Sequence, residues 1–128
     1  MCVLSGYLFL ILAETVLIRK SGELRYELVP FWSWKYVFEK WPLTRSRIAI
    51  LKQILLNIAM FIPIGFLLGD KGWKAVGISA GISLIIELCQ LISKRGLFEF
   101  DDIIHNIVGA AIGLGIYALL GKVMRNDY

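Results

Sequence analysis

The sequence predicts an all-α membrane protein, a bundle of four transmembrane helices with a polar stripe in its interior. Hydrophobic residues make up 58% of the 128 residues, and the mean hydropathy is +0.71; in soluble proteins only about half the residues are apolar. The apolar residues gather in four long runs. A few polar side chains lie inside these runs at helical spacing. Because a charge in a span costs on the order of 2.5–3.5 kcal/mol, it usually faces the protein interior. We expect residues 1–128 to form a single domain.

Charge and cysteine content exclude several other classes of function. The net charge of +4 comes from fourteen basic and ten acidic residues, and the basic ones lie mainly between the hydrophobic runs. This placement is typical of contact with anionic lipid headgroups, so we expect membrane lipids as partners and no nucleic acid. Cys2 and Cys89 form neither a disulfide framework nor a metal-binding spacing. We therefore expect no metal and no cofactor.

The first hydrophobic run is residues 3–18, and Glu14 interrupts it. The run is short for a span of about 20 residues. We do not expect it to be a signal peptide, because no basic segment precedes it and no small-residue cleavage site follows it. The absence of a basic segment also agrees with a start codon placed too late.

A polar connector follows the first run, over residues 19–47. It contains Trp32, Trp34 and Trp41, interleaved with basic residues. Tryptophan prefers the headgroup layer, where its apolar ring and its polar N–H are both satisfied. We expect the connector to lie on the membrane surface.

Three further spans complete the predicted bundle. The second covers residues 48–68, with Asn57 near its middle, and a tight turn at 70–73 leads into the third, at 74–92. A charged loop at 93–100 leads into the fourth, at 102–120. Four crossings would place both termini on the same side of the membrane.

Polar and small residues form one stripe on each of the last two predicted helices. Residues spaced by three or four positions lie on one helix face, and pairs of glycines four apart allow close helix packing or oligomerisation. The polar stripe of the third helix comprises Ser79, Ser83, Glu87, Gln90 and Lys94; that of the fourth comprises Asp102, Asn106, Gly109 and Gly113. The packing pairs are Gly77 with Gly81 and Gly109 with Gly113.

Several of these residues also have a purely structural interpretation. Asp101 or Asp102 can cap the fourth helix, and Asn57 and Gln90 can join helices. Glu87 is harder to explain in this way, because a carboxylate at that depth must be protonated, paired or hydrated. Asp102 and His105 are spaced to ligate a metal or pass a proton, but a two-residue motif is weak support for either.

The order of these motifs resembles the VanZ-like family of bacterial membrane proteins. The motifs are Asn57-x5-Pro63-x-Gly65, Glu87-x2-Gln90, Arg95 and Asp101-Asp102-x3-Asn106-x2-Gly109-x3-Gly113. They cover about half the chain, residues 56–117. The segment Leu28-Val-Pro-Phe31 is similar to the Leu-Ile-Pro-Phe element that precedes the second span in this family.

This resemblance implies a multi-pass protein of the bacterial cytoplasmic membrane. The family's namesake is associated with resistance to glycopeptide antibiotics of the teicoplanin type. His105 departs from the family pattern, which more often has an aliphatic residue there. Relatives with a basic N-terminus suggest that the connector faces outward, whereas positive-inside counting places it in the cytoplasm; we slightly favour the outward placement. The resemblance carries over a polar signature of Asn57, Glu87, Gln90, Arg95, Asp101, Asp102 and Asn106.

We expect a non-enzymatic protein of the cell envelope that binds its ligand in a polar cleft. The ligand would be a lipid, a lipid-linked wall precursor or a glycopeptide antibiotic. One alternative is an intramembrane enzyme acting on a lipid, with Glu87 or Asp102 as general base. Another is a structural subunit or a small transporter, working as a homo-oligomer. The candidate cleft residues are Asn57, Glu87, Gln90, Arg95, Asp101, Asp102, His105 and Asn106.

Overall fold

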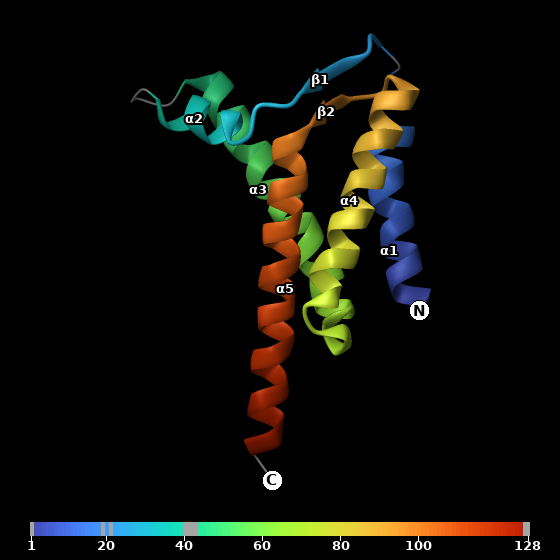
Figure 1. Cartoon of the computed structure of the whole chain (residues 1–128), viewed down its shortest axis with the longest axis vertical. Coiled ribbons are helices and arrows are strands. Elements are labelled where there is room, and N and C mark those ends of the chain that lie inside the picture. The colour runs from blue at the N-terminus through green and yellow to red at the C-terminus, as the bar shows by residue number, and fades with distance from the viewer. Residues whose placement is uncertain (1, 19, 21, 40–43, 127–128) are drawn as a thin grey trace.

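The computed structural model describes residues 2–18, 20, 22–39 and 44–126 and is mainly helical (Figure 1). A π-helix extends the first α-helix, and a 3₁₀ turn joins the third to the fourth. In chain order the elements are α1 (Cys2–Leu12), η1 (Ala13–Leu17), β1 (Arg25–Glu27), α2 (Trp32–Phe38), α3 (Arg45–Leu67), η2 (Gly69–Lys71), α4 (Lys74–Ser93), β2 (Leu97–Glu99) and α5 (Phe100–Asn126).

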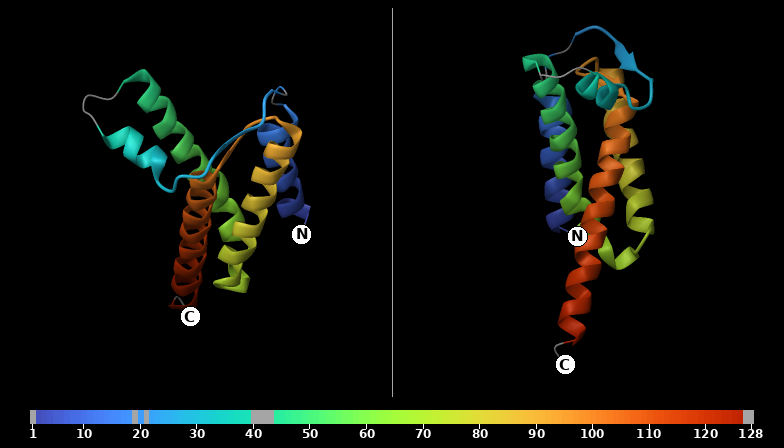
Figure 2. Two further views of the ribbon diagram at one scale, coloured as in Figure 1. Left: turned by 45° about the horizontal axis from the view of Figure 1, so that its top comes forward. Right: turned by 90° about the vertical axis from the view of Figure 1, so that its left-hand side faces the viewer.

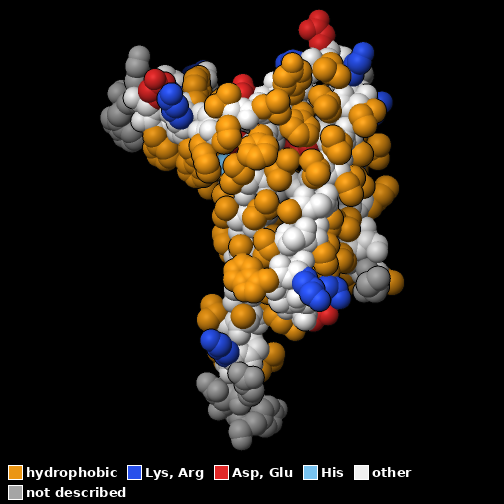
Figure 3. Space-filling model, in the orientation of Figure 1, with side chains coloured by type: hydrophobic (Ala, Val, Ile, Leu, Met, Phe, Trp, Pro, Cys, Tyr) orange, Lys and Arg blue, Asp and Glu red, His pale blue; other side chains and the backbone are white. Residues whose placement is uncertain are grey.

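Three helices, α3, α4 and α5, are long and apolar enough to cross a membrane. They correspond to the second, third and fourth predicted spans. Hydrophobic side chains cover much of the visible face between charged groups at its two ends (Figure 3). The α3 helix begins three residues earlier than predicted, because the Thr44 hydroxyl accepts a hydrogen bond from the Arg47 N–H (3.4 Å) and caps it. The prediction of a mainly helical fold is therefore confirmed, and three of the four predicted spans have the length and composition to cross a membrane.

The first hydrophobic run forms a shorter helix than a full span. α1 and η1 together cover Cys2–Leu17, which at 1.5 Å per residue reaches about 24 Å, less than the roughly 30 Å of a hydrocarbon core. By length and composition, the described residues thus contain three spanning helices and one shorter apolar helix. Both termini lie toward the same end of the molecule (Figure 1).

The connector and the predicted charged loop meet in a short parallel strand pair. Arg25 of β1 lies opposite Leu97 of β2 in the register, and the Gly22 N–H donates to the Lys94 carbonyl (2.7 Å). The prediction treated 93–100 as an irregular loop, which is wrong for its second half. The partner strand lies about 70 residues earlier, so no local pattern reveals the pairing. Residues 19, 21 and 40–43 of the connector, Trp41 included, lie outside the described residues.

Glycines bring α3 and α5 into close contact. A Cβ at Gly109 would lie 2.1 Å from the Ile58 carbonyl oxygen, and one at Gly113 would lie 2.0 Å from the Ile62 carbonyl oxygen. On the facing helix, a Cβ at Gly65 would lie 2.0 Å from the Ala110 carbonyl oxygen. All three contacts are impossible for a larger residue without a shift of the backbone. This is the close approach that small residues permit between membrane helices.

The second glycine pair lies on an open surface. A Cβ at Gly77 or Gly81 would meet no described atom within 4 Å, and both residues are exposed. Neither glycine contributes to helix packing within the described chain. Their predicted packing role stays a prediction for contacts between copies.

The α1 helix packs against the C-terminal half of α3, and Ile11 shares its buried cluster with Ala75 and Ile86 of α4. Ile11 joins Phe61 and Ile64 in the buried apolar core, and the Tyr7 hydroxyl donates to the Met60 carbonyl (2.9 Å). Above the contact between Tyr7 and Met60, a cavity lies between η1 and α3. The strand pair lies above the helices at this end of the molecule (Figures 1 and 2).

Candidate functional site

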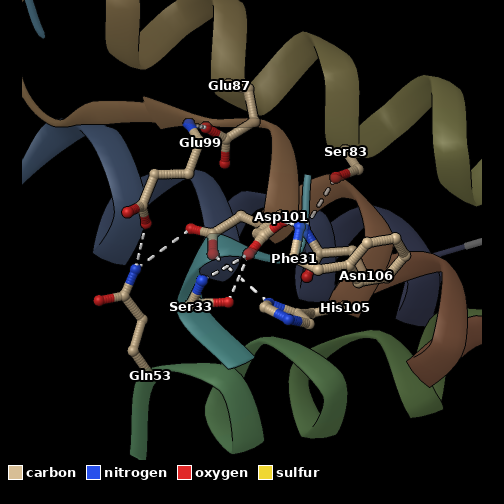
Figure 4. Close-up of polar contacts among 10 residues, drawn as sticks. Phe31, Ser33, Gln53, Ser83, Glu87, Glu99, Asp101, His105 and Asn106 are labelled. Carbon is tan, nitrogen blue, oxygen red and sulfur yellow. Dashed lines mark hydrogen bonds and ion pairs between the residues drawn. The ribbon is translucent and has the colours of Figure 1, made fainter. Parts of the chain in front are cut away.

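The first part of the site is a carboxylate that holds the connector to α5. Asp101, which is 1% exposed, accepts hydrogen bonds from the Phe31 N–H (2.5 Å), the Ser33 N–H (3.0 Å) and the Ser33 hydroxyl (2.5 Å). Phe31 has a left-handed backbone with φ of 61°, a conformation that costs a non-glycine residue on the order of 1–2 kcal/mol. We call this group the Asp101 clamp (Figure 4). It joins the Leu28–Phe31 motif to the Asp101–Asp102 motif.

The second part is a carboxylate cluster where β2 enters α5. The Gln53 amide donates to the Glu99 carboxylate and, at 3.4 Å, to the Asp102 carboxylate. Behind them, the carboxylate of Glu87 accepts a hydrogen bond from the Glu99 N–H (3.0 Å). Glu87 thus fixes the end of β2 against α4, and Gln53 of α3 reaches Glu99 from the other side (Figure 4).

This arrangement changes the acidity of Glu99. Burial raises the pKa of its carboxyl to about 7, helped by the nearby Asp102 and Asp101 carboxyls and a hydrogen bond to Asp102. The Gln53 amide acts in the opposite direction, because it donates to the charged form. Glu99 lies in β2, outside the spanning helices, and can exchange its proton near neutral pH.

The third part is the polar stripe between α4 and α5. Ser79, Ser83 and Glu87 are all buried, as the spacing on the third predicted span indicated. The Asn106 amide donates to the Ser83 hydroxyl (2.8 Å) and so links the two helices. Gln90 is also buried, and its backbone carbonyl accepts the Arg95 N–H (3.1 Å).

His105 lies against the connector, away from the cavity described below. Its ring is 2% exposed and meets Trp34 edge-on, with 5.8 Å between ring centroids. Its Nδ1 lies 3.7 Å from an Asp102 carboxylate oxygen, beyond hydrogen-bond distance. Within the described part of the chain, neither ring nitrogen has a hydrogen-bond partner.

A cavity of about 1030 Å³ lies between η1, α3 and the strand pair. Its lower end is lined by Tyr7 and Met60 and its upper end by Gly22 and the 94–97 turn. Along α3 it extends from Ala49 to Met60, which is roughly 16 Å at 1.5 Å per residue. The Arg95 guanidinium donates to the Leu17 carbonyl (3.0 Å) and ties the end of η1 to this turn.

The cavity gathers charged residues from both ends of the chain. Glu14 and Lys52 interrupt apolar runs, and both line it. The π-helix that contains Glu14 is a rare geometry that is frequent at functional sites. Five basic side chains line the cavity against three acidic ones. The basic ones are Lys20, Arg25, Lys52, Lys94 and Arg95; the acidic ones are Glu14, Glu99 and Asp102.

The structure divides the predicted cleft residues into two groups. Asn57, Arg95 and Asp102 line the cavity. The other five are buried behind it in the contacts among α4, α5 and the connector, and support its walls. These five are Glu87, Gln90, Asp101, His105 and Asn106.

Sequence reasoning missed some cavity residues and gave others no role. Lys52 carries a signal, because a lysine seven residues into an apolar helix is expensive unless it faces polar surroundings. Glu14 carries the same signal but was assigned no role. Gln53 and Glu99 carry no such signal in the sequence, because their contact forms only when β2 folds beside α3.

No group of three or more His, Cys, Asp and Glu side chains in the described ranges is arranged to hold a metal ion. The site offers hydrogen-bonding groups and charges. These are a carboxyl with a pKa of about 7, a second carboxylate beside it, and five basic side chains in the lining.

Comparison with known proteins supports a single family. The chain is similar to protein VanZ of Enterococcus faecium, with 33% identity over 80 residues, covering 58% of this chain and 49% of that protein. It therefore spans about half the length of this curated relative. No solved structure is significantly similar to it. The profile of the VanZ/LLP1 family matches residues 1–121, so the chain belongs to the VanZ/LLP1 family.

Proposed function

We propose that this chain is a multi-pass protein of the bacterial cytoplasmic membrane that protects the cell envelope, contributing to resistance against teicoplanin-type glycopeptides. The cavity would bind an amphiphilic envelope molecule: a lipid, a lipid-linked wall precursor or the antibiotic. The observation that carries this proposal is the convergence of Glu14, Lys52 and Asn57 on one cavity. Such residues are costly in lipid, so their shared location supports a binding role.

In this proposal Cys2–Leu17 is the fourth crossing helix. A short apolar helix can cross where the bilayer thins locally or flanking residues snorkel. The connector and the strand pair then lie on the outer face, where the cavity is exposed to wall precursors and antibiotics. The exposed aromatic residues Tyr36 and Phe38 suit the headgroup layer at this level.

Growth inhibition tests this function. A susceptible Gram-positive host would express the wild-type chain, Lys52→Gln or Lys35→Gln, with membrane abundance matched by immunoblotting. Lys52 lines the cavity, whereas Lys35 is an exposed residue of α2. We expect the wild type and Lys35→Gln to raise the teicoplanin concentration needed for inhibition, and Lys52→Gln to lose most of this protection. Vancomycin serves as the comparison drug.

The outcome that rejects the proposal is plain. If the wild type is present in the membrane and protects against neither drug, the antibiotic role is excluded. If Lys52→Gln protects as well as the wild type, the cavity is not the site of action.

An enzymatic function is the second candidate, and the Glu99–Asp102 pair favours it. Both residues line the cavity, and a carboxyl with a pKa of about 7 suits proton transfer near neutral pH. Mass spectrometry of membrane lipids from expressing and deletion strains tests this reading. A lipid species that changes with the wild type but not with Asp102→Asn would support it, and identical lipid profiles would exclude it.

A further inference from the structure

We propose that the ligand of the cavity is a lipid that carries a phosphate group, and that the phosphate is held by the basic side chains at the cavity's connector end. This inference rests on the proposed function for the location of the site. It adds the chemical class of the ligand, which that proposal leaves open among a lipid, a wall precursor and an antibiotic.

Charge is the first argument. Cations outnumber anions among the lining residues, five to three. Glu99 is partly protonated near neutral pH because its pKa is raised, which increases the imbalance. Lysine and arginine are the usual ligands of phosphate, lysine as a point charge and arginine through paired N–H groups. An anionic ligand group is therefore favoured over a neutral or cationic one.

The position of the cations is the second argument. Lys20, Arg25, Lys94 and Arg95 belong to the connector and the α4–β2 turn, at the end of the spanning helices. Lys52 lies seven residues after the start of α3. The basic groups therefore gather at headgroup level, with one lysine lower on the α3 wall.

The lower wall supplies the third argument. Below Lys52 and Gln53 the α3 wall consists of Leu56, Asn57, Ala59 and Met60. Except for the Asn57 amide, these side chains are apolar and suit an acyl or prenyl chain. Below Lys52 the α3 wall is thus mainly apolar, while the facing η1 wall contributes Glu14 and Thr15. The cations gather at the level of the headgroups. This polarity matches a phospholipid or a polyprenyl phosphate and does not match a free ion.

Binding of defined lipids to the purified, delipidated protein in detergent tests the proposal. The probes are dioleoyl phosphatidic acid, dioleoylglycerol with the same chains but no phosphate, and inorganic phosphate. Native mass spectrometry would follow lipid binding and competition. Since the phosphate can accept charge-assisted hydrogen bonds that dioleoylglycerol cannot form, we expect phosphatidic acid to bind at least about tenfold more tightly than dioleoylglycerol.

Matched variants locate the phosphate. Lys52→Gln and Arg25→Gln should each weaken phosphatidic acid binding several-fold, and Lys52→Arg should restore it because the charge returns. Lys35→Gln, which removes an exposed charge outside the cavity, should leave binding unchanged. A thermal melt of each variant separates lost binding from lost folding.

Three results would overturn the inference: equal affinity for dioleoylglycerol, unchanged affinity in folded Lys52→Gln, or competition by inorganic phosphate as strong as that by the lipid. The last would identify a free anion as the ligand. The growth assay can give a negative result even when these binding measurements support the inference. A wild-type protein that binds phosphatidic acid through Lys52 but gives no protection would retain this inference and lose only the antibiotic role.

Discussion

Asp101 and Ser33 are joined by two hydrogen bonds, from the Ser33 N–H and from its hydroxyl, although 68 residues separate them. Both groups are buried. The bonds start from the first turn of α5, where an aspartate would be expected to cap its own helix. Instead the carboxylate orders the segment that precedes α2. The connector is therefore fixed to α5 through a side chain.

Loss of this clamp should destabilise the protein. Asp101→Ala leaves the Phe31 and Ser33 donors without their acceptor, so we expect the free energy of unfolding to fall by about 2–3 kcal/mol. Thermal denaturation in detergent would show a lower melting temperature, and limited proteolysis would cut faster near residue 31. Asp70→Ala is the control, because Asp70 is exposed and pairs only weakly with Lys71. Equal melting temperatures for the two variants would contradict the clamp.

The close contact of α3 and α5 predicts that alanine destabilises the protein at Gly109 but not at Gly81. Gly109→Ala places a methyl group against the Ile58 carbonyl and should cost about 1–3 kcal/mol of stability, typical of overpacking. Gly81→Ala meets open space and should be neutral or stabilising by up to about 1 kcal/mol, because alanine favours helix. Melting temperatures of the two variants in the same detergent make the comparison, and a similar loss in both would argue against close contact at Gly109.

The hydrogen bond between Asn106 and Ser83 should appear as a coupling energy. In a double-mutant cycle with Asn106→Ala and Ser83→Ala, we expect coupling of roughly 0.6–1.7 kcal/mol, the range found for polar pairs between membrane helices. Unfolding measured in mixed micelles would supply the four free energies. Strictly additive losses would mean that each side chain acts through other neighbours.

The raised pKa of Glu99 predicts that the stability of the protein depends on pH. The pKa of its carboxyl is about 7 in the fold against an ordinary value of 4.5. Between these values the folded protein holds a proton that the unfolded chain has released. The free energy of unfolding should therefore decrease as pH rises from about 4.5 to about 7, and then level off as far as Glu99 is concerned.

The variant Glu99→Gln cannot titrate and should remove this contribution to the slope. Its control, Glu23→Gln, alters an exposed carboxyl and should keep the wild-type slope. The titratable and charged groups around Glu99 are the carboxyls of Glu87, Asp101 and Asp102 and the basic residues that line the cavity. Melting temperatures measured at intervals of half a pH unit would resolve the difference, and parallel curves for wild type and Glu99→Gln would refute the assignment.

Much of the helical architecture could be predicted because membrane helices carry their signal locally. The third span, predicted at 74–92, is α4 at Lys74–Ser93, and the burial of Ser79, Ser83 and Glu87 follows from their spacing alone. The first hydrophobic run is shorter than a full span in the sequence, and the helix that it forms, Cys2–Leu17, is also shorter than a full span.

The site was harder to predict because it depends on contacts between distant segments. The pairing of Tyr26 with Phe98 in the strands and the approach of Gln53 to Glu99 leave no periodic pattern in the sequence. The polar stripes predicted a single cleft, but their members face different surroundings in the structure. Glu87 holds the wall by its bond to Glu99, whereas Asp102 lines the cavity itself. Glu14 and Lys52, for which the sequence analysis predicts no role, also line the cavity. The cost of a charge in an apolar run is the signal that would have indicated them, since it does not depend on any pairing.

The strand pair has a consequence for the order in which the protein is assembled. Arg25 and Leu97 are paired, yet about 70 residues must be synthesised between them, which takes roughly 4–14 seconds at 5–20 residues per second. Until then Gly22, Arg25 and the 94–97 turn cannot come together at the upper end of the cavity. The nascent chain therefore has no complete cavity until its last helix begins to emerge. Any ligand of the cavity has to bind after Leu97 is synthesised, and a chain stopped before that residue lacks the upper wall.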